Sequence, residues 1–168
     1  RYCNVAGPRV YVDTFVNYNF NATNIRIAFA RLGAELARRG EKEKAVEVLD
    51  YGLEQMPVSQ FQYTYQYLPY IRAYYEARAT EKGDALFDSY AKNLEEYVDY
   101  FLSFPDNRQY LIENQFADKL TALAELHRIA ENYGRTDRAA RILNLFDWLF
   151  GPEGQTDYTE YEQTVLPT

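Results

Sequence analysis

Residues 25–57 read IRIAFARLGAELARRGEKEKAVEVLDYGLEQMP, and this stretch decides the fold. Its apolar residues recur at intervals of three and four, which is the period of one face of an α-helix. They fall into two runs on either side of Gly40, a residue that often ends helices because it adopts a left-handed backbone at little cost. Pro57 stops the second run, because proline cannot continue a helix. The stretch therefore predicts two antiparallel helices joined by a short turn.

Each predicted helix carries an apolar stripe. In the first helix the stripe is formed by Ile25, Phe29, Leu32 and Leu36, and in the second by Val46, Leu49, Leu53 and Met56. Gly33 and Ala45 are small, and we expect them to face each other so that the two helices approach closely. A larger side chain at position 33 would overpack this contact.

The spacing of this hairpin resembles a tetratricopeptide repeat of about 34 residues that begins at Arg26. A second pass begins near Thr64, with its second helix running on to about residue 103. A third begins near Leu120, and we expect its first helix to start early, near Arg108. The turns at residues 40–45, 78–83 and 134–139 align, although Arg78 stands where a turn glycine is usual. We predict an all-α fold of about three tetratricopeptide-type antiparallel helix hairpins in a right-handed superhelical array. The predicted repeat domain spans residues 24–152, with repeats at about 26–59, 64–103 and 108–152.

Three stretches do not follow the repeat. We expect residues 1–23 to form an extended lead-in and residues 153–168 an irregular tail. Residues 60–67 alternate between polar and aromatic, which is typical of a strand, whereas the repeat register requires a helix there. We favour a kinked helix, in which Pro69 causes the kink or supplies the first turn.

The composition excludes several classes of function. The chain has 168 residues and a net charge of −7, with a pI near 4.8, which disfavours binding to nucleic acid or to anionic membrane surfaces. Cys3 and His127 are the only residues of their types, so we expect neither an internal disulfide nor a metal site, and no cofactor. No apolar run approaches the about 18 residues of a membrane span, so we expect no direct membrane insertion by this fragment. Tyrosine is in excess, with 17 copies.

An ordered series of short segments resembles a specific family. These segments are 10–13 (VYVD), 24–26 (NIR), 29–32 (FARL), 45–50 (AVEVLD), 56–57 (MP), 68–69 (LP) and 73–75 (AYY). Over roughly residues 8–135 the chain is similar to the soluble C-terminal region of large membrane proteins from Gram-negative gut and oral bacteria. Members carry many N-terminal transmembrane helices and are described as protein O-mannosyltransferase-like or as of unknown function.

The resemblance implies a non-catalytic accessory domain, because glycosyl transfer in such a protein would belong to its membrane part. It also implies tethering to the periplasmic side of the inner membrane. The chain begins with Arg1 rather than Met, as expected of a piece of a longer protein. The partner would be a protein or a peptide, and the parent's own membrane domain is one candidate.

In tetratricopeptide repeats, fixed positions of each first helix line a concave binding face. The residues at these positions that we select as candidate binding residues are Ile27, Ala34, Arg38, Tyr65, Arg72, Tyr75, Arg128 and Asn132. Three readings of this face remain open. It binds a protein or peptide, it is filled by the chain's own ends, or it binds a glycan through Tyr65 and Tyr75. The glycan reading requires both rings to be open to solvent and roughly coplanar.

No residue pattern indicates catalysis. His127 has Glu125 and Glu131 as its only local carboxylates, a spacing that arises by chance on any helix. Carboxylate pairs such as Glu95 and Glu96 are expected on solvated helix faces. We therefore predict no catalytic residue in this chain.

The C-terminal end of the last predicted helix is strongly apolar. It carries Trp148, Leu149 and Phe150, and no fourth repeat follows to bury them. We expect residues 153–168 to fold back over this end, or a second chain to cover it.

Overall fold

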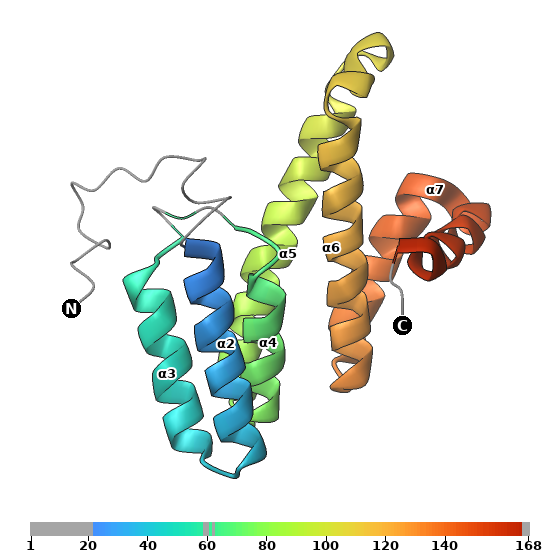
Figure 1. The fold of residues 1–168 in the computed structure, drawn as a ribbon. Coiled ribbons are helices and arrows are strands. Elements are labelled where there is room, and N and C mark those ends of the chain that lie inside the picture. The colour runs from blue at the N-terminus through green and yellow to red at the C-terminus, as the bar shows by residue number, and fades with distance from the viewer. Residues whose placement is uncertain (1–21, 59–60, 62, 166–168) are drawn as a thin grey trace. The chain divides into compact units, whose positions relative to one another are not determined.

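The computed structural model describes residues 22–58, 61 and 63–165. Its elements are α2 (Ala22–Arg38), α3 (Lys42–Gln55), α4 (Tyr67–Glu76), α5 (Thr80–Leu102), the 3-10 helix η1 (Asp106–Leu111), α6 (Glu113–Asn132) and α7 (Thr136–Val165) (Figure 1). No strand occurs among the described residues, so the predicted all-α class is confirmed. The chain divides into two compact units within α5. Unit 1 ends at Tyr90, and unit 2 begins at Ala91.

The same backbone turn closes α2, α4 and α6. In each turn one residue has a positive φ, which is 83° at Gly40, 60° at Arg78 and 65° at Gly134. The N–H of this residue bonds to the carbonyl three positions back, and the next N–H bonds to the carbonyl five positions back. This pair of bonds defines the Schellman motif, which satisfies carbonyl groups at a helix C-terminus. The three turns that align in sequence therefore also share their backbone geometry.

The buried face of α2 differs from the predicted stripe. Its buried residues are Arg26, Ala30, Gly33 and Ala37. The residues of the predicted stripe lie beside this face, and Leu32 is 48% exposed. Because α2 packs against both α3 and α4, mostly small side chains face its neighbours, and larger ones occupy the edge. The expectation that Leu32 belongs to the core is wrong.

The close approach between α2 and α3 involves Leu49 rather than Ala45. A Cβ atom placed on Gly33 would lie 2.7 Å from the Leu49 side chain. Ala45 instead forms a small cluster with Ala37 and Ala77. The expected pairing of Gly33 with Ala45 is therefore wrong, although both residues are buried and both permit close packing.

The connection between α3 and α4 is not helical in its described part. Residues 58, 61 and 63–66 are turns or irregular backbone, and α4 begins only at Tyr67. The kinked helix favoured for this segment is therefore wrong, and these residues form no strand either. Pro69 lies in the first turn of α4, where the N–H that proline lacks has no partner within the helix.

Tyrosine rings make up much of the core of unit 1. The buried rings are those of Tyr67, Tyr70, Tyr74, Tyr75 and Tyr90. Tyr63 stacks on Tyr90, with ring centroids 5.4 Å apart, and contacts Tyr67 at 4.9 Å. α4 is almost entirely buried because it packs against α2 and α3 and also contacts α5, where Tyr75 lies against Gly83. The tyrosine excess of the sequence therefore serves packing here.

In unit 2, α6 packs against α7. Leu123, Leu126 and Ile129 are fully buried on α6, and Ile142 is fully buried on α7. Phe101 at the end of α5 stacks on Phe116 with a centroid distance of 3.7 Å. α6 begins at Glu113, whereas the sequence predicts a start near Arg108, because a 3-10 turn intervenes after Pro105.

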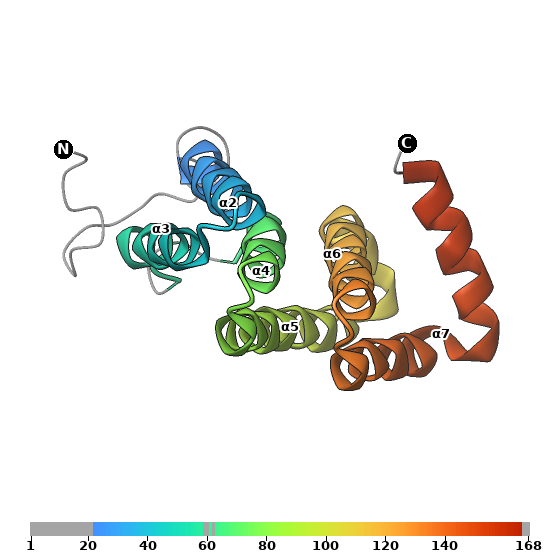
Figure 2. The same ribbon diagram turned by 90° about the horizontal axis from the view of Figure 1, so that it is seen from below.

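The predicted irregular tail is wrong for residues 153–165, because α7 continues to Val165. The helix is interrupted at Gly151, where φ is 67°, and Figure 2 shows α7 changing direction partway along. Pro152 follows directly, and proline fits the first turn of a new helical segment. The predicted lead-in, residues 1–23, lies outside the described residues except for residues 22 and 23, which belong to α2. None of the helices described here is both long and apolar enough to span a membrane.

Candidate interaction surfaces

The candidate residues on α2 differ in accessibility. Ile27 and Ala34 are half-buried, and Ala34 packs against the core cluster that contains Ala30 and Leu49. Arg38 is exposed and forms an ion pair with Glu35 at 2.5 Å. Of the three, only Ile27 and Arg38 offer a sizeable side chain to a partner.

The two candidate tyrosines do not form an open pair. Tyr65 precedes α4 and is 52% exposed, whereas Tyr75 is only 6% exposed. The Tyr75 hydroxyl donates a hydrogen bond to Asp84 Oδ1 at 2.9 Å, which fixes the ring within the protein. Arg72 is half-buried on the same side of α4 as Pro69. The hypothesis that Tyr65 and Tyr75 form a glycan-binding platform is therefore wrong, because it requires both rings to be open to solvent.

The remaining candidates lie on α6 in unit 2. Arg128 Nη2 donates to both carboxylate oxygens of the buried Glu125, at 3.0 and 2.8 Å. Asn132 is exposed and is the last residue of α6. His127 is half-buried, and its Nδ1 lies 3.7 Å from Glu131, which is too far for a hydrogen bond.

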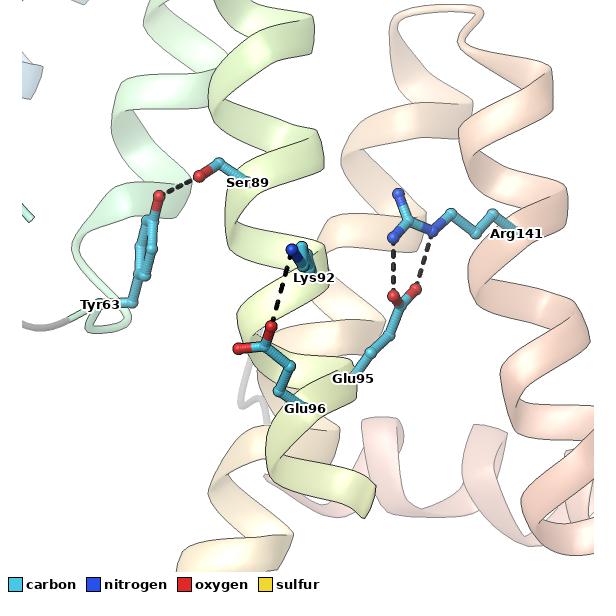
Figure 3. A network of polar contacts seen from close by, with 6 residues as sticks. All are labelled: Tyr63, Ser89, Lys92, Glu95, Glu96 and Arg141. Atoms are coloured by element: carbon cyan, nitrogen blue, oxygen red, sulfur yellow. Dashed lines mark hydrogen bonds and ion pairs between the residues drawn. The ribbon is translucent and has the colours of Figure 1, made fainter. Parts of the chain in front are cut away.

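The carboxylates of Glu41, Glu95 and Glu96 form ion pairs. Glu95 accepts two hydrogen bonds from Arg141, and Glu96 lies 3.8 Å from Lys92 (Figure 3). Glu41 pairs with Lys44 at 2.5 Å. In the part of the chain that the structure describes, no group of three or more metal-ligating side chains is close enough to hold an ion. These carboxylates therefore contribute to ion pairing within or between helices.

The segment of α7 that precedes Gly151 carries exposed apolar side chains. Trp148 is 64% exposed and Phe150 is 42% exposed, and Leu143 is also exposed on this helix. The three side chains do not share one face of the helix, because Leu143 and Phe150 are two turns apart on one side and Trp148 lies on another. The expectation that residues 153–168 cover Trp148 is wrong for the described residues, because the ring stays exposed even though the chain continues as a helix. The break at Gly151 redirects the chain beyond this point.

Sequence reasoning missed a buried cluster around Arg26. The guanidinium carbon lies 5.2 Å from the centroid of the Phe61 ring and 4.8 Å from that of Tyr67. Arg26 is 1% exposed, and Tyr67 and Tyr70 are fully buried. Arg26, Tyr67 and Tyr70 together are called the Arg26 cluster. A signal was present in the sequence, because Arg26 lies four residues before Ala30 and seven before Gly33, on the face of small residues.

Burial changes the proton affinities of this cluster. It raises the pKa of Tyr67 to about 12, and it also raises the pKa of Tyr70 above its ordinary value. Burial also lowers the pKa of Arg26, while the two phenols oppose that change. At neutral pH the phenols are therefore protonated, and the guanidinium keeps its charge because arginine is so strongly basic.

The described residues thus include exposed apolar side chains on α7, of which Trp148 is the most exposed, and a buried polar cluster around Arg26. Several of the candidate residues on α2, α4 and α6 already pack or form hydrogen bonds within the protein. Comparison of the chain with protein-family models, with curated proteins and with solved structures finds no match.

Proposed function

We propose that this chain is a non-catalytic protein-interaction or scaffolding domain built from tetratricopeptide-type helix hairpins. Two observations support the repeat architecture. The turns that close α2, α4 and α6 share one hydrogen-bond pattern, and α2 packs against its hairpin partner α3 and against the following helix α4. Arrays of this kind stack each repeat on its neighbours, and in this proposal the array is a right-handed superhelix.

The family resemblance supports a place for this domain in the cell. On this proposal the chain is a soluble extracytoplasmic part of a larger glycosyltransferase-like membrane protein, held on the periplasmic side of the inner membrane. Its partner is a protein or a peptide, and the parent's own membrane domain is the first candidate. The net charge of −7 argues against nucleic acid as a partner.

The exposure of Trp148 on α7 is the observation that carries the proposal. Burial of a large apolar side chain stabilises a protein or a complex by about 1.5–3 kcal/mol, and exposure of Trp148 forgoes this gain. Exposed apolar groups that are rimmed by polar residues mark interaction sites, and here Asn144 and Asp147, one turn before Trp148 and next to it in the helix, are exposed as well. Tryptophan is also enriched among the residues that dominate binding energy at interfaces.

Site-specific photo-crosslinking tests this function. A photoreactive phenylalanine analogue replaces Trp148 in the full-length gene product in its natural host, and a second strain carries it at Asp118, an exposed residue of α6. We expect position 148 to give one discrete protein adduct, or an internal crosslink to the parent's membrane part, and position 118 to give neither. Equal labelling at both positions, or no adduct at position 148, would contradict the proposal.

A further inference from the structure

Three buried polar atoms in the Arg26 cluster have no hydrogen-bond partner among the described residues. They are Arg26 Nε, Tyr67 Oη and Tyr70 Oη. Buried polar groups in folded proteins are nearly always paired, so each exception requires an explanation such as a bound ion or ligand. Here the three exceptions occur in residues that are one another's electrostatic neighbours.

The Arg26 guanidinium is poorly satisfied. It has five N–H donors, and its two hydrogen bonds are long, from Nη1 to Thr64 Oγ1 at 3.4 Å and from Nη2 to the Phe61 carbonyl at 3.3 Å. Bonds from arginine to a carboxylate are shorter, at about 2.7–2.9 Å. No carboxylate pairs with Arg26 within the described ranges of the chain. The guanidinium lies over the rings of Phe61 and Tyr67, and ring faces attract a cation, but these contacts are not hydrogen bonds to its N–H groups.

The two phenols supply further donors. Because burial keeps both phenols protonated, each hydroxyl has one hydrogen to donate at neutral pH. Gly52 on α3 makes room for the Tyr70 hydroxyl, since a Cβ atom at position 52 would overlap it. The cluster therefore combines a positive charge with two neutral donors, and it has too few acceptors.

We propose that Arg26, Tyr67 and Tyr70 form a binding site for the carboxylate group of a small ligand. A carboxylate brings one negative charge and two oxygens with about four acceptor positions. It matches the guanidinium geometry and would leave acceptor positions for the phenol hydroxyls. Binding would neutralise a buried charge that is otherwise costly to desolvate.

Thermal unfolding in sodium formate tests this site. Formate is the smallest carboxylate, so it is the suitable probe for a guanidinium that is almost fully buried. We expect formate to raise the melting temperature of the wild-type chain in a saturable way, relative to sodium chloride at the same ionic strength. Inorganic phosphate should not reproduce the effect. Equal shifts in all three salts would overturn the proposal.

Two matched variants separate the site from general stability. Tyr70→Phe keeps the ring and removes an unpaired hydroxyl, so without formate it should be as stable as the wild type or more stable. Its apparent affinity for formate should fall about tenfold, the factor that corresponds to one lost hydrogen bond of ordinary strength. Tyr74→Phe is the control, since its hydroxyl donates to Asp50 at 2.8 Å, outside the cluster. This control should be less stable and keep the formate response. A full response in Tyr70→Phe would refute the assignment.

The Arg26 Nε–H group provides a direct readout that needs no mutation of the cluster. In a ¹H–¹⁵N spectrum its signal should move to higher proton frequency as formate is added, and the change should saturate over the same range as the thermal shift. Arg31, an exposed arginine of the same helix, is the internal control. If the Arg26 signal does not move, or moves equally in chloride, the site does not bind carboxylate.

Discussion

The carboxylate of Glu95 on α5 accepts two hydrogen bonds from Arg141 on α7, from Nε at 2.8 Å and from Nη2 at 2.7 Å. Both side chains are partly buried, and the bidentate geometry makes this a strong pair. We predict that Glu95→Gln lowers the free energy of unfolding by about 1 kcal/mol. Glu96→Gln is the matched control, because Glu96 lies 3.8 Å from Lys92 and both side chains are well exposed (Figure 3). Urea denaturation that gives equal losses for both variants would contradict this ranking.

The packing at Gly33 predicts whether replacing this residue stabilises or destabilises the chain. In an open helix position, Gly→Ala stabilises by about 1 kcal/mol through helix propensity. Here a new Cβ atom would lie 2.7 Å from Leu49, so Gly33→Ala should instead destabilise the chain, by about 1–3 kcal/mol. Adding Leu49→Ala should make the two substitutions less than additive, because the smaller side chain removes the overlap. A more stable Gly33→Ala variant would mean that the packing of α2 on α3 is wrong.

The left-handed backbone at Arg78 predicts a stabilising substitution. A residue other than glycine in this conformation carries a penalty of about 1–2 kcal/mol, which glycine avoids. Glycine also costs more conformational entropy on folding, because it is freer in the unfolded chain. Taking both effects together, Arg78→Gly should raise the free energy of unfolding by about 0.5–1 kcal/mol. The reverse change at the equivalent turn, Gly40→Arg, should lower the free energy of unfolding by a similar amount. Denaturation midpoints that move in the same direction for both variants would exclude a common turn geometry.

The buried tyrosines predict a loss of stability at high pH. The pKa of Tyr67 is raised from 10.0 to about 12 by burial, so between these values the folded chain keeps a proton that the unfolded chain has lost. The contribution of the protonated Tyr67 hydroxyl to the free energy of unfolding is therefore fully present below pH 10. It is lost as the pH rises toward 12. Urea denaturation from pH 9 to 11 measures this slope. Tyr67→Phe should make the slope shallower, and Tyr65→Phe, which changes an exposed ring, should not. A slope unaffected by Tyr67→Phe would contradict the burial.

Much of the fold could be predicted because the residues that end its helices act locally. Gly40, Pro105 and Gly134 act through their own backbone preferences, so the turns and the end of α5 near residue 103 follow from sequence. The irregular connection before α4 could not be predicted in the same way, because period-2 alternation favours a strand there and the repeat register favours a helix.

The candidate site was less predictable, because burial depends on neighbouring helices. Tyr75 falls at an open first-helix position of the repeat register, yet its ring lies against Gly83 of its own hairpin partner α5 and is buried. On α2 the large apolar residues suggested the core face, whereas small residues and Arg26 occupy it. The predicted repeat domain ends at residue 152, close to the break at Gly151, but the repeat pattern contains no fourth repeat and so does not predict that the chain resumes as a helix.

The central claim is that α7 presents a binding surface for a protein partner, and Trp148 can report on it alone because it is the only tryptophan. The chain labelled with 5-fluorotryptophan should give one ¹⁹F signal, with the chemical shift of a solvated ring. We predict that solubilised membranes of the natural host broaden or shift this signal, and that unlabelled chain in excess restores it by competition. A sharp signal that no membrane or soluble fraction alters would contradict the claim.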